Sequence, residues 1–359
     1  MTQQQLRNSS WDRSVATRHQ VAVLAGTSDS VVSYVLNNGP RPVAPATRER
    51  VLKAVEELNY RPNALARSLR TRESMTLGLI LPDGSNPFFA ALSLQLENAA
   101  FAKGYTLLFG NTMDDDRREE VYVRSLVDRQ VDGLLLIPSH GARAWEADLS
   151  RSDIPSVILD RDISLEGMSV FLADNAGGGY AATQHLIEHG HRRVGCIAGP
   201  LDEQPTKGRV AGWRAALTGA ELEASLPLLR DAPFGRGPAF LAAREILSLP
   251  DRPTALFVTS DEQAAGVIRA ASELGISVPQ ELAICSFDGS VASAFTVPSL
   301  TTIRQPIGEI AVAAIDHLIA RIHDPKLPAV REIFDVEIIR RRSCGCDDVS
   351  AVPSEEAGA

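Results

Sequence analysis

Polar side chains suited to ligand recognition follow several of the apolar runs in this 359-residue chain. Carboxylates and a guanidinium can each hydrogen-bond two neighbouring hydroxyl groups at once, which suits a polyhydroxylated ligand such as a sugar. Any one of them alone could equally be a helix cap or half of a surface ion pair, and for Asp261 we favour a helix N-cap. The candidate ligand contacts of this kind are Asp83, Asp160, Arg209, Ser260, Asp288 and Gln305.

Aromatic residues accompany these polar positions. The segment Asn86-Pro87-Phe88-Phe89 follows an apolar run, and Phe234 lies further along the chain. Because an aromatic ring can cover the apolar face of a sugar, Phe88, Phe89 and Phe234 are also candidate ligand contacts.

The motifs of common enzymes are missing. Gly177-Gly178-Gly179 lacks the Gly-x-Gly-x-x-Gly spacing of a dinucleotide site and is more typical of close helix–sheet packing. There is no nucleophile elbow, His-Glu-x-x-His or phosphate-binding loop. The seven histidines form no ligand-spaced cluster, and His185, His189 and His191 fall at a polar helix end where they complement its dipole. We therefore expect a binding protein and not an enzyme.

The four cysteines are interpreted as reduced thiols. Cys196 and Cys285 lie in apolar, strand-like runs, while Cys344-Gly-Cys346 is too short and solitary for a structural zinc site. No metal or cofactor is predicted, and metal binding by the Cys-x-Cys pair is the alternative interpretation.

From residue 76 onward, short apolar runs alternate with helical stretches, which predicts parallel sheets covered on both faces. Such doubly wound sheets bind ligands at the carboxyl ends of their strands, which is where the polar residues fall. The expected strands are 76–81, 105–110, 133–137, 157–160, 170–173, 194–198, 255–259, 282–287 and 333–338. Expected helices include 87–103, 175–189, 209–217, 261–274 and 308–322.

Before this region, residues 18–36 predict two short helices joined by a turn at Gly26. Val21 and Leu24 lie three apart and are expected on one face of a short helix, and Ser28 can cap the second helix. Two helices joined by a tight turn form a helix-turn-helix, whose second helix meets DNA base edges. On the second helix, Val32, Val35 and Leu36 are expected to face inward. The side chains that then face outward are Asp29, Ser30, Ser33 and Tyr34.

Two further helices are expected. Residues 45–58 carry apolar side chains at 51, 52, 55 and 58, the stripe of a third helix packed on the first two. Residues 62–70 could form a helix of barely two turns, which needs a partner to be stable.

Four short motifs, and the order in which they occur, resemble those of the lactose-repressor (LacI/GalR) family. They are Val-Ala-x-x-Ala-Gly-x-Ser, Val-Ser-x-Val-Leu-Asn, Thr-Arg-Glu and Tyr-x-Pro-Asn-x-x-Ala-Arg-Ser-Leu. The resemblance implies that the last helix is a hinge that folds in the operator's minor groove, with Leu69 as the wedge between base steps. The DNA contacts that it implies are Ser28, Asp29, Ser30, Ser33, Tyr34, Asn37, Asn63, Ala66, Arg67, Leu69 and Arg70.

The resemblance extends to the rest of the chain. It implies a two-lobe, periplasmic-binding-protein-like α/β sensor core, in which Asp160, Arg209, Ser260, Asp288 and Gln305 match effector-binding positions. Relatives that bind purines hold a basic residue in the loop before the Arg-x-Ala-Gly-Trp segment. Here Glu203 lies in that loop, and no Lys or Arg occurs between Cys196 and Lys207, which argues against a purine effector.

The charge distribution agrees with a DNA-binding headpiece. Residues 1–75 hold 11 Lys and Arg against 6 Asp and Glu, a net +5, whereas the remaining residues carry a net −14. Neither a signal peptide nor an 18-residue apolar run is apparent, so a cytoplasmic protein that contacts no membrane is expected.

We therefore expect a sequence-specific transcriptional regulator, an all-α helix-turn-helix headpiece on the α/β core, that binds operator DNA as a homodimer. In the favoured interpretation, a sugar-type inducer releases the protein from its operator. The alternatives are a regulator that binds DNA together with a corepressor such as a nucleobase, and a binding protein without a regulatory role. The expected parts are a disordered tail (1–17), headpiece (18–61), hinge helix and linker (62–75), core (76–342) and a flexible tail (343–359) without the heptads of a tetramerising coiled coil. Lobe 1 is expected at 76–173 and 303–328, and lobe 2 at 174–302 and 329–342.

Overall fold

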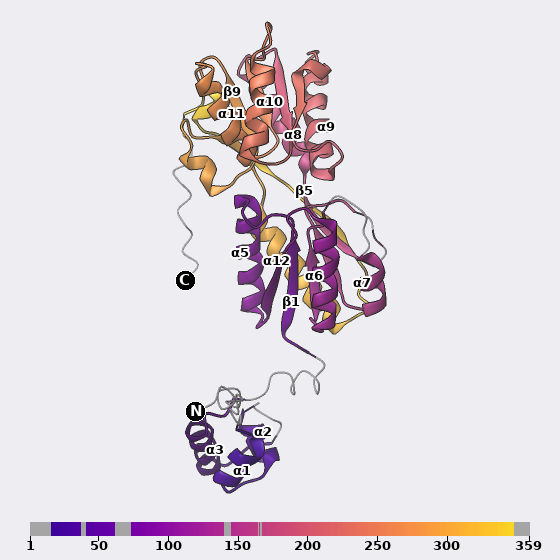
Figure 1. The fold of residues 1–359 in the computed structure, drawn as a ribbon, viewed down its shortest axis with the longest axis vertical. Helices are drawn as coiled ribbons and strands as arrows, with labels where there is room; N and C mark the ends of the chain where they lie inside the picture. The colour runs from indigo at the N-terminus through magenta and orange to yellow at the C-terminus, as the bar shows by residue number, and fades with distance from the viewer. Residues whose placement is uncertain are drawn as a thin grey trace, which may run out of the picture. The chain divides into compact units, whose positions relative to one another are not determined.

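The computed structural model describes residues 16–36, 41–61, 73–139, 145–163, 165 and 167–347. The chain divides into two compact units, one before Met75 and one from Met75 onward. We call them the headpiece and the core; Figure 1 shows the elements of each.

The headpiece is a bundle of three helices with its own apolar centre. The helices are α1 (Arg18–Leu24), α2 (Asp29–Leu36) and α3 (Pro45–Glu57). Their buried side chains are Val21, Ala22, Ala25, Val32, Val35, Val51 and Ala54.

The predicted inward position of Leu52 is wrong, and Leu24 does not share the buried face of Val21. Leu24 and Leu52 are each 47% exposed. Leu52 directly follows the buried Val51 and is therefore turned about 100° around the helix, onto its flank. In α1 the inward face is built from Val21 and two small residues, which leaves Leu24 at its edge.

The turn between α1 and α2 has the predicted construction. Gly26 adopts a left-handed conformation with φ 61°, and the Thr27 N–H donates to the Ala22 carbonyl at 2.9 Å. This pattern closes a helix with a glycine that has no Cβ to strain. Ser28 Oγ then accepts a 3.4 Å hydrogen bond from the Val31 N–H, so its role as a cap is confirmed.

The first lobe of the core is a six-stranded parallel sheet in the order β11-β5-β4-β3-β1-β2. Its strands are β1 (Thr76–Leu81), β2 (Thr106–Asn111), β3 (Gly133–Leu136), β4 (Ser156–Leu159), β5 (Ser169–Ala173) and β11 (Arg331–Phe334). Alternate strand residues point to opposite faces of the sheet, so the buried apolar side chains form two separate clusters, one on each face. Helices α5 (Pro87–Ala102) and α12 (Ile307–His323) cover one face, and α6 (Asp116–Asp128) and α7 (Glu146–Ser152) cover the other.

The second lobe repeats this plan with the strand order β12-β10-β9-β8-β6-β7, in which β12 alone is antiparallel. Its strands are β6 (Val194–Ala198), β7 (Leu229–Asp231), β8 (Ala255–Val258), β9 (Ala283–Asp288), β10 (Thr301–Arg304) and β12 (Glu337–Ile339). Helices α8 (Asn175–Glu188) and α9 (Gln204–Gly219) cover one face, and α10 (Arg236–Leu247) and α11 (Asp261–Glu273) cover the other. Three short 3₁₀ turns complete the lobe: η1 (Leu226–Leu228), η2 (Val291–Phe295) and η3 (Arg342–Cys344).

The glycine run at the start of α8 allows close packing, as predicted. A Cβ at Gly178 would lie 2.5 Å from the ring of Phe287 on β9, and a Cβ at Gly179 would lie 2.2 Å from the Arg209 carbonyl oxygen on α9. The helix therefore approaches both the sheet and its neighbouring helix too closely for any side chain there.

The chain crosses between the lobes three times, after Ala173, after Arg304 and after Phe334. The predicted single strand 333–338 is wrong, because β11 pairs with β5 in the first sheet and β12 pairs with β10 in the second. The boundary predicted near Thr302 lies a few residues later, since β10 continues to Arg304 in the second sheet.

The segment after residue 342 is not entirely a flexible tail. Ser343 is buried, its Oγ donates to the Ile284 carbonyl at 2.7 Å, and it accepts from the Thr301 N–H at 2.8 Å. Cys344 is buried in the core of the second lobe. The chain is therefore packed as far as Cys344, the last residue of η3; beyond it Cys346 is half-buried, and Gly345 and Asp347 are exposed.

Helices within the described ranges are short, and α12 is the longest at 17 residues. In those same ranges no helix has both the length and the apolar composition to cross a membrane.

Candidate DNA-contact face and ligand cleft

The outer face of α2 presents short polar side chains. Ser28 and Ser30 are exposed, and Asp29, Ser33 and Tyr34 are half-buried. These five predicted contacts therefore lie at or near one surface of the headpiece. The other predicted DNA contacts fall outside the described residues: Asn37, Asn63, Ala66, Arg67, Leu69 and Arg70.

Asp29 has basic neighbours from α1. Arg18 Nε lies 3.8 Å from one carboxylate oxygen, and His19 Nδ1 lies 3.2 Å from the other. An isolated carboxylate would repel DNA phosphates, and an adjacent guanidinium offsets part of that repulsion.

A cavity of about 30 Å³ lies between the two lobes, at the carboxyl ends of strands from both sheets. This volume suffices for one or two water molecules but not for a sugar, so the lobes are closed on one another. Seven of the nine predicted effector contacts line the cavity, whereas Asp83 and Gln305 do not. The first lobe contributes Asn86, Phe88, Phe89, Asp160 and Arg161, and the second contributes Pro205, Arg209, Phe234, Ser260 and Asp288.

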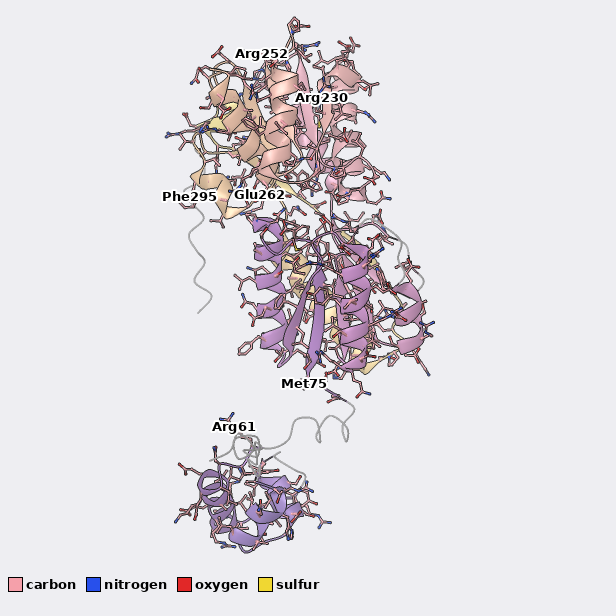
Figure 2. All side chains as sticks on the ribbon, viewed as in Figure 1. Arg61, Met75, Arg230, Arg252, Glu262 and Phe295 are labelled. Atoms are coloured by element: carbon pink, nitrogen blue, oxygen red, sulfur yellow. The ribbon has the colours of Figure 1, made fainter. Side chains whose placement is uncertain are left out.

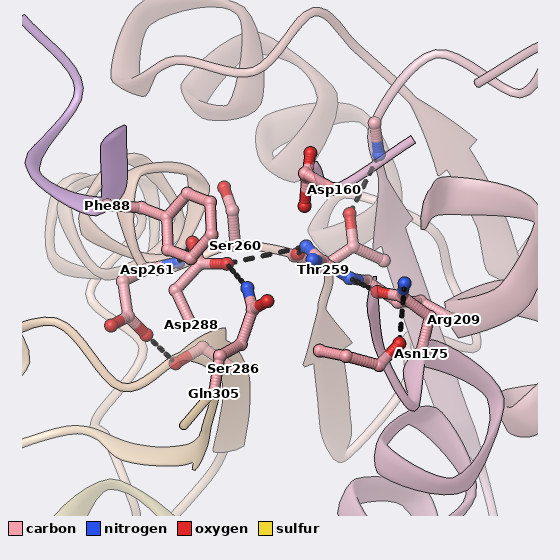
Figure 3. A network of polar contacts seen from close by, with 12 residues as sticks. Phe88, Asp160, Asn175, Arg209, Thr259, Ser260, Asp261, Ser286, Asp288 and Gln305 are labelled. Carbon is pink, nitrogen blue, oxygen red and sulfur yellow. Dashed lines mark hydrogen bonds and ion pairs between the residues drawn. The ribbon is translucent and has the colours of Figure 1, made fainter. Parts of the chain in front are cut away.

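Arg209 is the most constrained group in the cleft (Figure 3). Its Nε donates to Asn175 Oδ1 at 2.8 Å, and its Nη1 donates to the Thr259 carbonyl at 2.6 Å and lies 3.4 Å from Asp288 Oδ1. The guanidinium carbon also lies 3.8 Å from the centre of the Phe287 ring. A buried cation held on several sides loses little conformational freedom when it binds a ligand.

Asp288 ends β9 with a positive φ of 118°, which a non-glycine residue adopts only when its surroundings impose it. Its Oδ1 accepts from Gln305 Nε2 at 3.0 Å, so Gln305 supports the site through Asp288. Burial raises the pKa of Asp288 to about 8; Arg209 opposes the shift and Asp261 adds to it. A carboxyl group that titrates near neutrality can donate as well as accept hydrogen bonds.

Asp160 and Arg161 face the second lobe from the end of β4. Asp160 also has a positive φ, 61°, and its Oδ2 accepts from Arg161 Nη1 at 2.5 Å. Arg161 Nη2 lies 2.9 Å from Oε2 of Glu203, at the start of α9 in the opposite lobe. All three side chains are at least nine-tenths buried, so this chain of charges crosses the interface between the lobes. The sequence placed Arg161 at a strand end beside the predicted contact Asp160, and Glu203 in the loop before α9, but it did not predict that these two side chains pair across the lobes.

Aromatic rings form the apolar part of the cleft. Phe88 and Phe89 lie edge to face with their centres 5.2 Å apart, at the start of α5. Asn86 Oδ1 caps this helix by accepting from the Phe88 N–H at 2.9 Å, and Asn86, which belongs to the segment singled out in the sequence, also lines the cavity. Phe234 packs over Gly199, where a Cβ would lie 2.3 Å from the ring.

Asp83 does not reach the cleft. Its Oδ1 accepts from Ser85 N at 2.8 Å and from Ser85 Oγ at 2.6 Å, which shapes the turn between β1 and α5. Asp83 therefore stabilises a local turn, which is the alternative role considered for these polar residues.

The prediction that Asp261 caps α11 is wrong by one residue. Ser260 is the N-cap, and its Oγ accepts from the N–H of residue 263 at 3.1 Å. Asp261 is buried and accepts four hydrogen bonds, from Ser286 Oγ, Thr302 Oγ1 and the N–H and Oγ of Ser290, at 2.5–2.7 Å. It therefore ties α11 to β9 and β10 beneath the cleft; burial raises its pKa against those hydrogen bonds.

A helix-turn-helix headpiece joined to a two-lobe core with a polar cleft defines a class of protein, the ligand-responsive transcription regulator. Residues 17–63 match the family model described as bacterial regulatory proteins, lacI family, and residues 183–344 match a periplasmic binding protein-like domain.

Individual relatives agree with this class. The chain is 37% identical over 332 residues to the "HTH-type transcriptional repressor PurR" of Aliivibrio salmonicida, covering 92% of this chain and 99% of that one. It is 39% identical over 321 residues to the "Ribose operon repressor" of Escherichia coli K12, covering 88% and 96%. Among solved structures, a CelR–cellobiose complex superposes with a TM-score of 0.69 at 30% identity, covering 91% and 99%. The protein belongs to the lacI family of bacterial regulatory proteins, and it is a DNA-binding transcriptional regulator with a small-molecule effector, not an enzyme.

Proposed function

We propose that the protein is a cytoplasmic repressor that binds a near-palindromic operator as a homodimer and is released by a monosaccharide of the ribose class. The observation that carries the effector assignment is the convergence of Asp160 from one lobe with Arg209 and Asp288 from the other on one cleft.

The chemistry of the cleft suits a small polyol. Two carboxyl groups accept hydrogen bonds from hydroxyls, and Arg209 offers a fixed fork of donors to a neighbouring pair of oxygens. The rings of Phe88 and Phe234 give the apolar face of a sugar a surface to lie on. The similarity to a protein named as a ribose operon repressor points the same way.

The Arg161–Glu203 ion pair argues for a ligand of modest size. With the lobes closed, this pair lies beside a cavity of only about 30 Å³, so a ligand must separate the lobes slightly or displace part of the polar network. A pentose requires a smaller separation of the lobes than a disaccharide does. An acidic residue at position 203 also disfavours a planar, electron-rich nucleobase.

Exposed apolar residues on the first lobe support a homodimer. They lie on the edge strand β2, in the turn after it and on α5 and α6, both of which contact β2, and exposed apolar side chains gathered on neighbouring elements commonly mark an interface. The side chains in question are Leu94, Phe101, Leu108, Phe109, Met113 and Val121, with exposures between 37% and 75%.

Ligand and operator are coupled through the arrangement of the lobes. The core begins at Met75, at the end of the first lobe away from the second (Figure 2), and the proposed hinge segment 62–70 precedes it. A marginal helix there forms only when two subunits hold it together, so a change in the dimer can fold or melt it. The ligand shifts operator affinity only as far as it prefers one lobe arrangement over the other.

The experiment uses the full-length protein with an operator selected from a random duplex library. Fluorescence anisotropy of that operator is measured while ribose, cellobiose or hypoxanthine is added. We expect ribose to weaken operator binding roughly 5- to 150-fold, the usual range of allosteric coupling. Tighter binding with hypoxanthine would identify a corepressor system instead. A protein that selects no duplex at all would overturn the operator assignment itself.

A further inference from the structure

The second lobe contains four side chains whose types and arrangement are those of a metal site. His185 and His189 lie one turn apart at the end of α8, and Cys344 and Cys346 flank Gly345 at the end of η3. One ligand atom from each, two imidazole nitrogens and two sulfurs, lie within 4.8 Å of one another. Asn175, which contacts Arg209, begins α8, whereas His185 and His189 lie at the other end of this helix, and none of the four residues lines the proposed effector site.

The distances match a tetrahedral centre. His185 Nε2 lies 3.2 Å from Cys344 Sγ and 3.6 Å from Cys346 Sγ, and His189 Nε2 lies 3.4 Å from Cys346 Sγ. Around a zinc ion with Zn–S of about 2.3 Å and Zn–N of about 2.0–2.1 Å, tetrahedral angles place sulfur and nitrogen about 3.6 Å apart. Small adjustments of the side chains would therefore bring all four atoms to bonding distance of one ion.

Hydrogen bonds alone account for this cluster less well. A ring nitrogen has either one proton or one lone pair, yet His185 Nε2 faces two sulfurs. A thiol is also a weak donor and a weak acceptor, which gives little reason to gather four such groups. A divalent cation engages all four at once, and two thiolates balance its charge.

The backbone and surroundings fit a built site. Gly345 has a φ of 93°, a conformation that glycine adopts without strain and that turns the chain between the two cysteines. Thr301 Oγ1 lies 3.0 Å from Cys344 Sγ, where a hydroxyl can donate to a thiolate. His185 and Cys344 are buried, while His189 is exposed and Cys346 is half-buried, so the site opens to solvent on one side.

We propose that His185, His189, Cys344 and Cys346 bind one zinc ion. Two nitrogens and two sulfurs in a tetrahedral set are typical of structural zinc, and four protein ligands leave no open position for catalysis. The ion joins the C-terminal segment to α8 across 159 residues of chain and so fastens the end of the second lobe. The sequence analysis weighed the Cys-x-Cys pair by itself, whereas the fold brings two further candidate ligands to it from α8.

Zinc content of reduced, full-length protein is the direct test. After exposure to zinc and removal of unbound metal, elemental analysis is expected to give one zinc per chain. Cobalt(II), added to metal-stripped protein as a probe, should produce the intense visible bands of tetrahedral cobalt and a sulfur charge-transfer band, both removed by zinc. Protein that retains no stoichiometric zinc and gives only octahedral cobalt spectra would overturn the proposal.

Variants separate this site from other metal-binding surfaces. His189→Gln changes an exposed ligand and leaves the lobe core intact, and Cys346→Ser changes a half-buried one. Both should weaken zinc binding at least about tenfold, since even residues that only orient metal ligands have effects of this size. The matched control His191→Gln, which contacts Thr254 instead, should bind zinc as the wild type does.

Thermal melting gives a second readout that does not depend on any variant. Zinc should raise the melting temperature of the wild type, and a chelator should lower it again, whereas His189→Gln should respond to neither. Equal melting with and without zinc would contradict the structural role. Operator and sugar binding are measured on the same samples, so failure of the zinc site would leave the proposed regulatory function standing.

Discussion

Arg161 in the first lobe and Glu203 in the second form a direct ion pair, with 2.9 Å between Nη2 and Oε2. Both side chains are more than nine-tenths buried, and Arg161 is held from its own lobe by Asp160. The pair therefore joins the two lobes beside the cleft, and its contribution depends on how far they are closed.

Breaking this link should weaken the closed state. Glu203→Gln leaves Arg161 paired with Asp160 but removes the charge on the other lobe, so a ligand that must separate the lobes should bind more tightly, by about tenfold, which is the value of roughly one charged hydrogen bond. Operator affinity without ligand should fall slightly, because the arrangement of the lobes is what couples the ligand to the operator. Calorimetric titration with ribose measures the first and anisotropy the second. The control is Glu262→Gln, which alters an exposed ion pair with Arg236. An equal effect of both variants would show that the Arg161–Glu203 pair has no specific role in ligand binding.

Arg209 should be required for the response to ligand and not for DNA binding. Arg209→Lys keeps a positive charge beside Asp288 but loses the fork that contacts Asn175 and Thr259. We expect the variant to bind operator as the wild type does and to ignore the effector, as read by anisotropy during a ligand titration. Arg236→Lys provides a control on the surface of the same lobe. A full ligand response in Arg209→Lys would remove this residue from the site.

Leu69 should matter only in the DNA complex. Its assignment as a minor-groove wedge follows from the family resemblance, since the residue lies outside the described residues. Leu69→Ala is expected to abolish specific binding and bending of the operator while the core melts as before. Gel mobility of circularly permuted operator fragments measures the bend. Normal operator affinity in this variant would refute the hinge assignment.

The subunit interface should depend on β2. Phe109 is 53% exposed on this edge strand, and Phe109→Asp places a charge where the proposed homodimer excludes water. We expect light scattering to show monomers and operator affinity to fall, because each headpiece then binds alone. Leu226→Asp, at an exposed leucine of η1, should leave the dimer intact. If the Phe109→Asp protein is still a dimer, the subunit interface does not include β2 and lies on another face of the protein.

Stability should fall as pH rises because of Glu119 on α6. It is 2% exposed, and burial raises its pKa from 4.5 to about 7 despite hydrogen bonds from Ser139. Between these values the folded state holds a proton that the unfolded state lacks, so the stabilisation is complete below pH 4.5 and lost through about pH 7. Glu119→Gln should then be more stable than wild type near pH 8 by roughly 1–3 kcal/mol, and no more stable near pH 4.

Urea unfolding at both pH values measures this difference. The neighbouring Glu120, which pairs with Arg124 at the surface, supplies the control variant Glu120→Gln. A pH-independent gap between Glu119→Gln and wild type would show that the effect is not a titration.

Sequence patterns were most informative where a feature is local. The turn at Gly26, the cap at Ser28 and most strands of the core depend on residues close in the chain, and they were predicted correctly. The single strand expected at 333–338 was not, because which sheet a strand joins depends on partners far away in sequence. The same limit applies to Arg161 and Glu203, whose pairing requires two lobes to meet. It applies equally to His185 and His189, whose cysteine neighbours lie more than 150 residues away.

The order of the strands also decides when each part can fold during synthesis. The first sheet is completed by β11, which the ribosome makes only after almost all of the second lobe. Neither lobe can therefore be finished until the nascent chain is nearly whole, whereas the three headpiece helices are local and can fold as soon as they emerge. A chain that terminates early would carry a DNA-binding headpiece without a finished sensor, and no ligand could remove it from its target.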